Sequence, residues 1–141
     1  MEELSEIKDY ASKNLVPIMM EEGSDFICNY ILENNVKSVL EIGTAIGYSA
    51  IKFARVKNDV TVTSIEIDID RYIKAVQNVK DCELDSRIHL INEDALTAQI
   101  EGTFDLIFID AAKAQYIKFF EKYKNNLSEN GLIISDNLAF H

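Results

Sequence analysis

The fold is decided by the stretch VLEIGTAIGYSAI, residues 39–51. It opens with an apolar run that suits a buried strand, and from Tyr48 onward it has the spacing of a helix. Gly43 and Gly47 lie at the junction, where glycine lets the backbone turn tightly and approach a ligand closely. A tight turn without a ligand is the alternative interpretation, so this stretch predicts an α/β unit and only suggests a binding site.

Outward from this stretch, short apolar runs alternate with stretches of helical period, which is typical of βα units around a parallel sheet. Strands are expected at 38–42, 60–67, 87–92, 104–110 and 132–136. Helices are expected at 48–56, 69–80 and 114–126, whereas the 97–102 connection is ambiguous. Right-handed crossovers favour strands 38–42 and 104–110 as neighbours, with a crevice beyond their carboxyl ends.

Two helices are expected before the sheet. Residues 2–14 form an acidic stretch that ends before Pro17, and Ser24 has the character of an N-cap for the second helix. The buried face of this second helix is expected to carry Phe26, Ile27, Tyr30 and Ile31. A chain of 141 residues is therefore read as one domain, with N-terminal helices in 1–35 and the sheet core in 36–141.

The composition is 48% hydrophobic and 27% charged, which is ordinary for a globular protein. No run approaches the roughly 18 apolar residues of a membrane span, and the acidic start is unlike a targeting peptide, so we expect a cytoplasmic protein without membrane partners. The net charge of −10 opposes broad binding to nucleic-acid phosphates and weakens an RNA partner without excluding it. Cys28 and Cys82 stand apart and are read as free thiols.

Two acidic residues favour a nucleoside ligand at the crevice. Glu66 ends a predicted strand 23 positions after Gly43 (66 − 43), near the offset at which a carboxylate reaches ribose hydroxyls. Asp94 follows the next strand, where it would accept the adenine amino group or merely cap a turn. A dinucleotide template from Gly43 would need glycines at Ala45 and Tyr48, so an NAD-dependent dehydrogenase is a minor alternative.

Oxygen donors also end two neighbouring strands. Asp110 follows one of them, and Asp136 and Asn137 follow the next. Two carboxylates and an amide suit Mg²⁺ or another hard divalent cation, although separate loop caps would use the same residues. Lys113 and Tyr116 follow Asp110 at intervals of three, so on a starting helix they would share a face toward this site.

The stretches VLEIGTAIGYSAI (39–51), FDLIFIDAAKAQY (104–116) and LIISDN (132–137) resemble the cation-dependent O-methyltransferases, which include catechol and caffeoyl-CoA methyltransferases. VPIM (16–19) and FFE (119–121) add a likeness to the bacterial branch of tRNA 5-hydroxyuridine methyltransferases. The resemblance spans nearly the whole chain. It implies a Rossmann-like class I methyltransferase fold.

The same resemblance implies a role for each matching position. The S-adenosylmethionine contacts would be Met19, Gly43, Ser49, Glu66, Asp94, Ala95 and Asp110. Asp110, Asp136 and Asn137 would be the metal ligands, and Lys113 and Asp110 would be the catalytic residues, with Lys113 as the base. Asp110 would also lie beside the methionine portion of the cofactor. The implied reaction is Mg²⁺-dependent methyl transfer to a hydroxyl group, with 5-hydroxyuridine in tRNA as the preferred acceptor.

Two departures from the family qualify this expectation. Glu93 stands where a glycine is common, and members of the family continue through further strands beyond the position of His141. The chain is therefore expected to be C-terminally incomplete by about a third, with the strand at 132–136 at an open sheet edge that favours a homodimer. Methylation of a small catechol-like molecule and cofactor binding without catalysis are the alternative functions.

Overall fold

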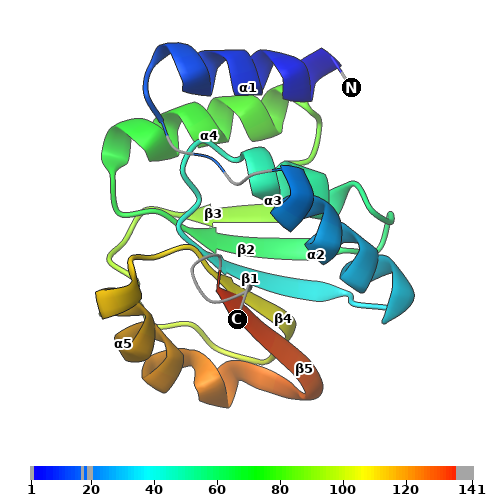
Figure 1. Cartoon of the computed structure of the whole chain (residues 1–141), viewed down its shortest axis with the longest axis vertical. Helices are drawn as coiled ribbons and strands as arrows, with labels where there is room; N and C mark the ends of the chain where they lie inside the picture. The colour runs from blue at the N-terminus through cyan, green and yellow to red at the C-terminus, as the bar shows by residue number, and fades with distance from the viewer. Residues whose placement is uncertain (1, 17, 19–20, 136–141) are drawn as a thin grey trace.

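The computed structural model describes residues 2–16, 18 and 21–135, with the side chains of Glu2 and Lys113 outside this part. Its strands are β1 (Ser38–Ile42), β2 (Thr61–Ile65), β3 (Ile88–Ile91), β4 (Phe104–Ile109) and β5 (Leu127–Ser135). They form one parallel sheet in the order β3-β2-β1-β4-β5 (Figure 1). The expected adjacency of β1 and β4 is confirmed, and this is the place where the strand order reverses.

The helices divide between the two faces of the sheet. They are α1 (Glu2–Lys13), α2 (Glu21–Glu33), α3 (Tyr48–Ala54), α4 (Ile69–Asp81) and α5 (Lys113–Tyr123), followed by a 3₁₀ turn at Lys124–Asn126. Helices α1 to α4 contribute to the core on one face, whereas α5 packs on the other (Figure 1). This division follows from right-handed crossovers, because β1 to β3 run outward in one direction and β4 to β5 in the other.

The strand residues alternate between two hydrophobic cores. On β4, Leu106 and Phe108 point toward α2 and α3, whereas Ile107 and Ile109 point toward α5. On β1, Val39 lies in the first core and Leu40 in the second. Both faces of the central strands are thus buried, which explains their continuous apolar sequences.

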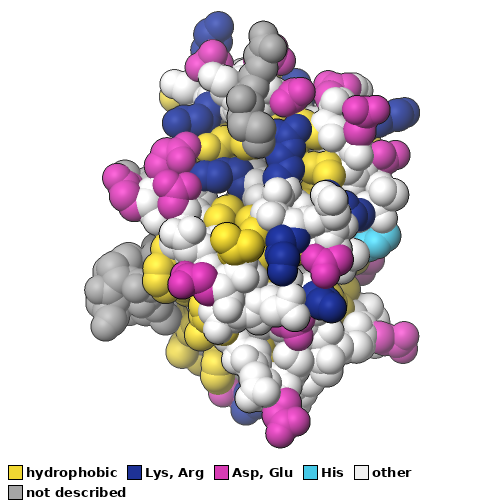
Figure 2. All heavy atoms as spheres, turned by 90° about the vertical axis from the view of Figure 1, so that its right-hand side faces the viewer, with side chains coloured by type: hydrophobic (Ala, Val, Ile, Leu, Met, Phe, Trp, Pro, Cys, Tyr) yellow, Lys and Arg dark blue, Asp and Glu magenta, His cyan; other side chains and the backbone are white. Residues whose placement is uncertain are grey.

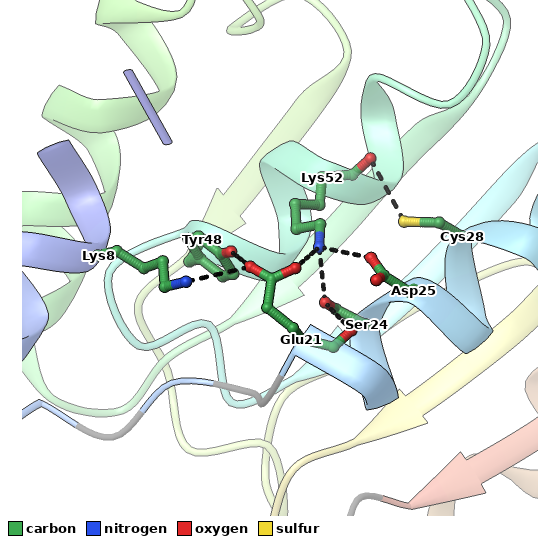
Figure 3. Close-up of polar contacts among 7 residues, drawn as sticks. All are labelled: Lys8, Glu21, Ser24, Asp25, Cys28, Tyr48 and Lys52. Carbon is green, nitrogen blue, oxygen red and sulfur yellow. Dashed lines mark hydrogen bonds and ion pairs between the residues drawn. The ribbon is translucent and has the colours of Figure 1, made fainter. Parts of the chain in front are cut away.

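The first three helices are joined through the Glu21 carboxylate. Figure 3 shows it between Lys8 of α1 and Tyr48 and Lys52 of α3. The Tyr48 hydroxyl donates to Oε1 at 2.7 Å, and the Lys52 ammonium approaches Oε2 at 3.1 Å. Lys52 also contacts Asp25 at 3.1 Å and donates to the Ser24 hydroxyl at 2.7 Å, so its ammonium links α3 to three residues of α2. This network fixes where α2 begins relative to the glycine turn.

Several expected boundaries need correction. Helix α2 begins at Glu21 rather than after Ser24, whose hydroxyl lies inside the helix and donates to the Glu21 carbonyl. Phe26 is 57% exposed, because the buried stripe of this helix runs through Ile27 and Ile31 instead. Strand β5 begins at Leu127, five residues before the expected start, because Leu127 pairs with Phe104 ahead of a break in the register.

The one face of the molecule in Figure 2 gives little support for a broad nucleic-acid interface. On the face in Figure 2, Lys and Arg side chains lie among Asp and Glu side chains, which agrees with the acidic composition. Among the described residues, no helix has the length and apolar character to cross a bilayer. Strand β5 forms one edge of the sheet, and the homodimer inferred from that edge stays a prediction.

Candidate functional site

A pocket of about 530 Å³ opens at the carboxyl ends of the parallel strands. Residues that follow four different strands line it: Gly43 and Ala45 after β1, Glu66 and Ile67 after β2, Asp94 to Leu96 after β3, and Asp110 to Ala112 after β4. Helix α5 adds Gln115 and Phe119, and α4 adds Arg71. The pocket thus occupies the crevice where the strand order reverses, the usual ligand position in open α/β sheets.

The glycine turn forms the pocket floor, where Gly43 packs so closely against Asp110 that there is no room for a side chain. A Cβ at this residue would lie 2.7 Å from the backbone oxygen of Asp110, closer than real Cβ contacts. The residue also has φ +101°, a conformation that L side chains rarely adopt. The ends of β1 and β4 can therefore meet this closely only with glycine here.

Glu66 is held in the pocket wall by backbone donors. The Ala45 N–H donates to Oε1 at 2.7 Å, and the Asp68 N–H donates to Oε2 at 3.1 Å. Asn92 donates to the Glu66 carbonyl at 2.8 Å and so fixes its backbone as well. Each carboxylate oxygen has more than one acceptor direction, so this carboxylate can still bind a pair of hydroxyl groups on a ligand.

The opposite rim is a closed turn that starts at Asp94. Its Oδ1 accepts from the Leu96 N–H at 2.9 Å, and its carbonyl accepts from the N–H groups of Thr97 and Ala98. Asp94 thus caps a turn and also lines the pocket, and its contact with an adenine amino group stays a prediction. Ala95 follows it in the same rim and is buried.

A buried polar network lies beneath the glycine turn. Glu41 is fully buried, and its two carboxyl oxygens accept from the hydroxyls of Ser49 and Ser64. The Ser64 hydroxyl also lies 2.6 Å from that of Thr44 in the turn. Burial raises the pKa of Glu41 to about 7, and the charges of Asp110 and Glu66 act in the same direction, although the two serine hydrogen bonds oppose the shift.

The structure brings together most of the residues expected to contact the cofactor. Five of them line the pocket: Gly43, Glu66, Asp94, Ala95 and Asp110. Ser49 does not line the described pocket, because its side chain points into the network around Glu41. Met19 lies outside the described residues.

The expected metal site is described only at Asp110. This residue follows β4, and its neighbour Ile109 pairs with Ser135 at the end of β5. Asp136 and Asn137 lie outside the described residues, as does the side chain of Lys113, the first residue of α5. Within the described residues, no group of three His, Cys, Asp or Glu side chains is suited to hold a metal ion.

The pocket residues that were not anticipated from the sequence include three on helices: Arg71, Gln115 and Phe119. Gln115 and Phe119 are four residues apart, a spacing that puts them on one face of α5 once that helix is placed against the crevice. The buried carboxyl of Glu41 was also missed. An acidic residue inside an apolar strand was the available signal, since such a group requires partners.

The five-stranded parallel sheet and its flanking helices have the α/β fold of class I methyltransferases. Solved structures of that class match this chain over part of their own length. The chain belongs to the O-methyltransferase family, which it matches over residues 1–141. A catechol O-methyltransferase from Niastella koreensis is 36% identical over 111 residues, which are 72% of this chain and 49% of that protein. A caffeoyl-CoA O-methyltransferase from Populus trichocarpa is 27% identical over 150 residues, covering 100% of this chain and 60% of that protein.

Solved structures agree with this assignment. A Staphylococcus aureus protein, provisionally named a caffeoyl-CoA O-methyltransferase, is 40% identical with a TM-score of 0.91, over 98% of this chain and 68% of that one. The SAH-bound methyltransferase PaMTH1 from Podospora anserina is 25% identical with a TM-score of 0.89, over 97% of this chain and 62% of that one. The chain spans about half to three fifths of the length of the curated relatives above.

Proposed function

We propose that the chain binds S-adenosylmethionine in the 530 Å³ pocket and transfers its methyl group to a hydroxyl oxygen. The observation that carries this proposal is the meeting of Gly43, Glu66 and Asp94 around one cavity. Glu66 would bind the two ribose hydroxyls, and the Asp94 carboxylate would accept from the adenine amino group. The absence of a side chain at Gly43 would let the rest of the cofactor lie against the turn.

The reaction requires little from the protein beyond alignment and proton removal. The acceptor oxygen attacks the methyl carbon, the carbon–sulfur bond breaks, and its electron pair stays on sulfur as the sulfonium becomes a thioether. The acceptor hydroxyl loses its proton, and Lys113 is the proposed base because it begins α5 three residues after Asp110. Holding the oxygen in line with the sulfur–methyl bond would supply most of the rate.

A divalent cation is proposed beside this position. The pairing of Ile109 with Ser135 supports it, because the next residues along these two parallel strands are Asp110 and Asp136. Asn137 would complete a set of oxygen ligands that suits Mg²⁺. When bound, such an ion orients two acceptor oxygens and favours the ionised form of a hydroxyl.

A small hydroxylated aromatic molecule is the acceptor that we favour. The relatives named above are catechol and caffeoyl-CoA methyltransferases, and the acidic composition suits a small substrate better than RNA. The hydroxylated wobble uridine of tRNA stays a prediction from the likeness of VPIM and FFE, and no comparison supports it.

Calorimetric titration with S-adenosylmethionine tests the cofactor site. We expect saturable binding, and a loss of about 10- to 100-fold in Glu66→Gln, because each weakened hydrogen bond involves a charged carboxylate. Glu101→Gln is the matched control, since Glu101 is exposed and does not line the pocket. No binding in the wild type would refute the proposal, and NAD binding in its place would restore the dehydrogenase alternative.

Methyl transfer is tested separately with a catechol and with hypomodified tRNA, each with and without Mg²⁺. Transfer to the catechol alone would support the favoured acceptor, and transfer to tRNA would replace it. Cofactor binding with no transfer to either acceptor would identify a binding chain without catalysis. Loss of transfer in Asp110→Asn with Mg²⁺ present would support the proposed ion site.

A further inference from the structure

The pocket rim after β3 is held from outside by the last residues of α5. The Tyr123 hydroxyl donates to the Ala95 carbonyl at 2.6 Å, and the Lys122 ammonium donates to the same oxygen at 2.8 Å. Lys122 also donates to the Ala98 carbonyl. A carbonyl oxygen has two lone pairs, so Tyr123 and Lys122 together satisfy the Ala95 oxygen.

This rim also presents a hydrogen-bond donor beside an acceptor. The Ala95 N–H has no acceptor among the described residues, and Ala95 lines the pocket. In the adjacent Asp94, Oδ1 is bonded to the Leu96 N–H, whereas Oδ2 has no donor within the described part of the chain. A ligand at this rim therefore meets a carboxylate acceptor next to a backbone donor.

This order matches one kind of purine edge. A 6-aminopurine has a donor at its exocyclic amino group next to an acceptor at N1, and it can pair with both rim groups. A 6-oxopurine has the reverse order, an acceptor at O6 and a donor at N1. It would face the Asp94 carboxylate with an oxygen and the Ala95 N–H with another N–H, leaving both rim groups without a hydrogen-bond partner.

We propose that Lys122 and Tyr123 are positioning residues for purine selection. They fix the Ala95 carbonyl, and with it the Ala95–Leu96 peptide group whose N–H holds Asp94 Oδ1, so that Asp94 Oδ2 and the Ala95 N–H stay in place for a 6-aminopurine. The inference rests on the proposed function only in requiring that the pocket binds a purine nucleoside. Tyr123 is 1% exposed, so the Ala95 oxygen is tied to a rigid group rather than to a solvated one.

The arrangement on α5 supports this role. Gln115, Phe119, Lys122 and Tyr123 follow one another at intervals of four, three and one, so one helix face both lines the pocket and holds its rim. The pKa of Tyr123 is raised to about 12, chiefly by burial and further by the charges of Asp94 and Glu93. The hydroxyl therefore stays protonated, and it remains a donor to Ala95 at any ordinary pH.

The test compares two ligands that differ only at the purine: S-adenosylhomocysteine and S-inosylhomocysteine. Wild-type protein is expected to prefer the adenosyl ligand by about 100-fold or more. In Tyr123→Phe and in Lys122→Met the adenosyl affinity should fall about tenfold while the inosyl affinity changes little, so the ratio shrinks. Lys124→Met is the matched control, because Lys124 is exposed and bonds to Glu121.

The outcomes separate the two proposals. An equal loss for both ligands, or an unchanged ratio in both variants, would overturn the positioning role and leave the cofactor proposal intact. Binding of neither ligand by the wild type would overturn the cofactor proposal itself. If Tyr123→Phe does not fold, as judged by circular dichroism, the half-buried Lys122→Met still gives the comparison.

Discussion

The Ser49 hydroxyl donates a hydrogen bond to the carboxyl group of Glu41, which is fully buried beneath the glycine turn. Ser64 donates to the other oxygen, and Thr44 of the turn lies within hydrogen-bond distance of Ser64. The turn that shapes the pocket is therefore joined to β1 and β2 through a group whose charge depends on pH.

In the wild type, the free energy of unfolding should fall as the pH rises from 4.5 to about 7, and Glu41→Gln should remove this fall. The pKa of Glu41 is about 7 in the folded protein, above its ordinary value of 4.5, chiefly because of burial. The folded state thus holds an extra proton in this window, and stability is lost as pH rises through it, by roughly 3 kcal/mol. Urea unfolding at several pH values measures the loss, with exposed Glu101→Gln as control. Equal slopes in wild type and Glu41→Gln would contradict the assignment.

Gly43→Ala should cost more stability than Gly102→Ala. Both glycines have positive φ, so an alanine at either is strained by about 1–2 kcal/mol. Only the Gly43 substitution adds a clash, because its Cβ meets the Asp110 oxygen at 2.7 Å, whereas nothing lies within 4 Å at Gly102. Chemical denaturation gives the two losses, and S-adenosylmethionine affinity should fall at Gly43 alone. Equal losses at both positions would mean that β1 and β4 separate without cost.

Arg87→Met should destabilise the protein by about 2–3 kcal/mol. One guanidinium nitrogen donates to the carbonyls of Ala54, Lys57 and Val60 at 2.7, 3.1 and 2.8 Å, so the substitution removes the donor from three oxygens of one connection. Arg87→Lys should lose less, since an ammonium can still donate to these carbonyls. Thermal unfolding measures both, and a loss below 0.5 kcal/mol in Arg87→Met would show that water replaces the guanidinium easily.

Glu21→Gln should lower stability near neutral pH, and this effect should shrink as the pH falls toward 2. The hydrogen bonds from Tyr48 and from Lys52 and Lys8 lower the pKa of Glu21 to about 2. The stability that it contributes is present above pH 4.5 and is lost as pH falls through the folded pKa. Half of the Glu21 side chain is exposed, so the effect should also shrink with added salt.

Glu22→Gln provides the control for this substitution, because it changes the neighbouring exposed residue of the same helical turn. Unfolding curves at pH 7 and pH 2.5, at low and high salt, give the comparison. A Glu21→Gln effect that does not depend on pH would mean that the network in Figure 3 contributes through packing rather than charge.

The sequence was sufficient to predict the parallel sheet, the adjacency of β1 and β4, and several pocket residues that directly follow strands. Gly43, Glu66 and Asp110 were found because parallel strands bring their carboxyl ends to one edge, so a position after a strand also gives a position in space. The start of α2 was misplaced because contacts of Glu21 with two other helices, which no local pattern records, outweigh the capping tendency of Ser24.

Two further features required tertiary information. The early start of β5 was missed because Ser128 to Gly131 are polar or turn-forming, and only the pairing of Leu127 with Phe104 draws this segment into the sheet. The contacts of Lys122 and Tyr123 with Ala95 join residues 27 and 28 positions apart. Nothing local in FFEKY distinguishes these two side chains from ordinary surface and core residues of a helix.

No single secondary-structure element forms the pocket, because residues after β1, β2, β3 and β4 each supply part of its wall. A partly folded chain can therefore hold no ligand. The fraction of chains with ligand bound in the pocket then reports how completely the sheet has assembled. At a concentration of 100 times Kd, a ligand specific for the folded state would add about 2.7 kcal/mol to stability. Such a ligand would rescue distant lesions such as Arg87→Met, acting as a chemical chaperone for positions that it never touches.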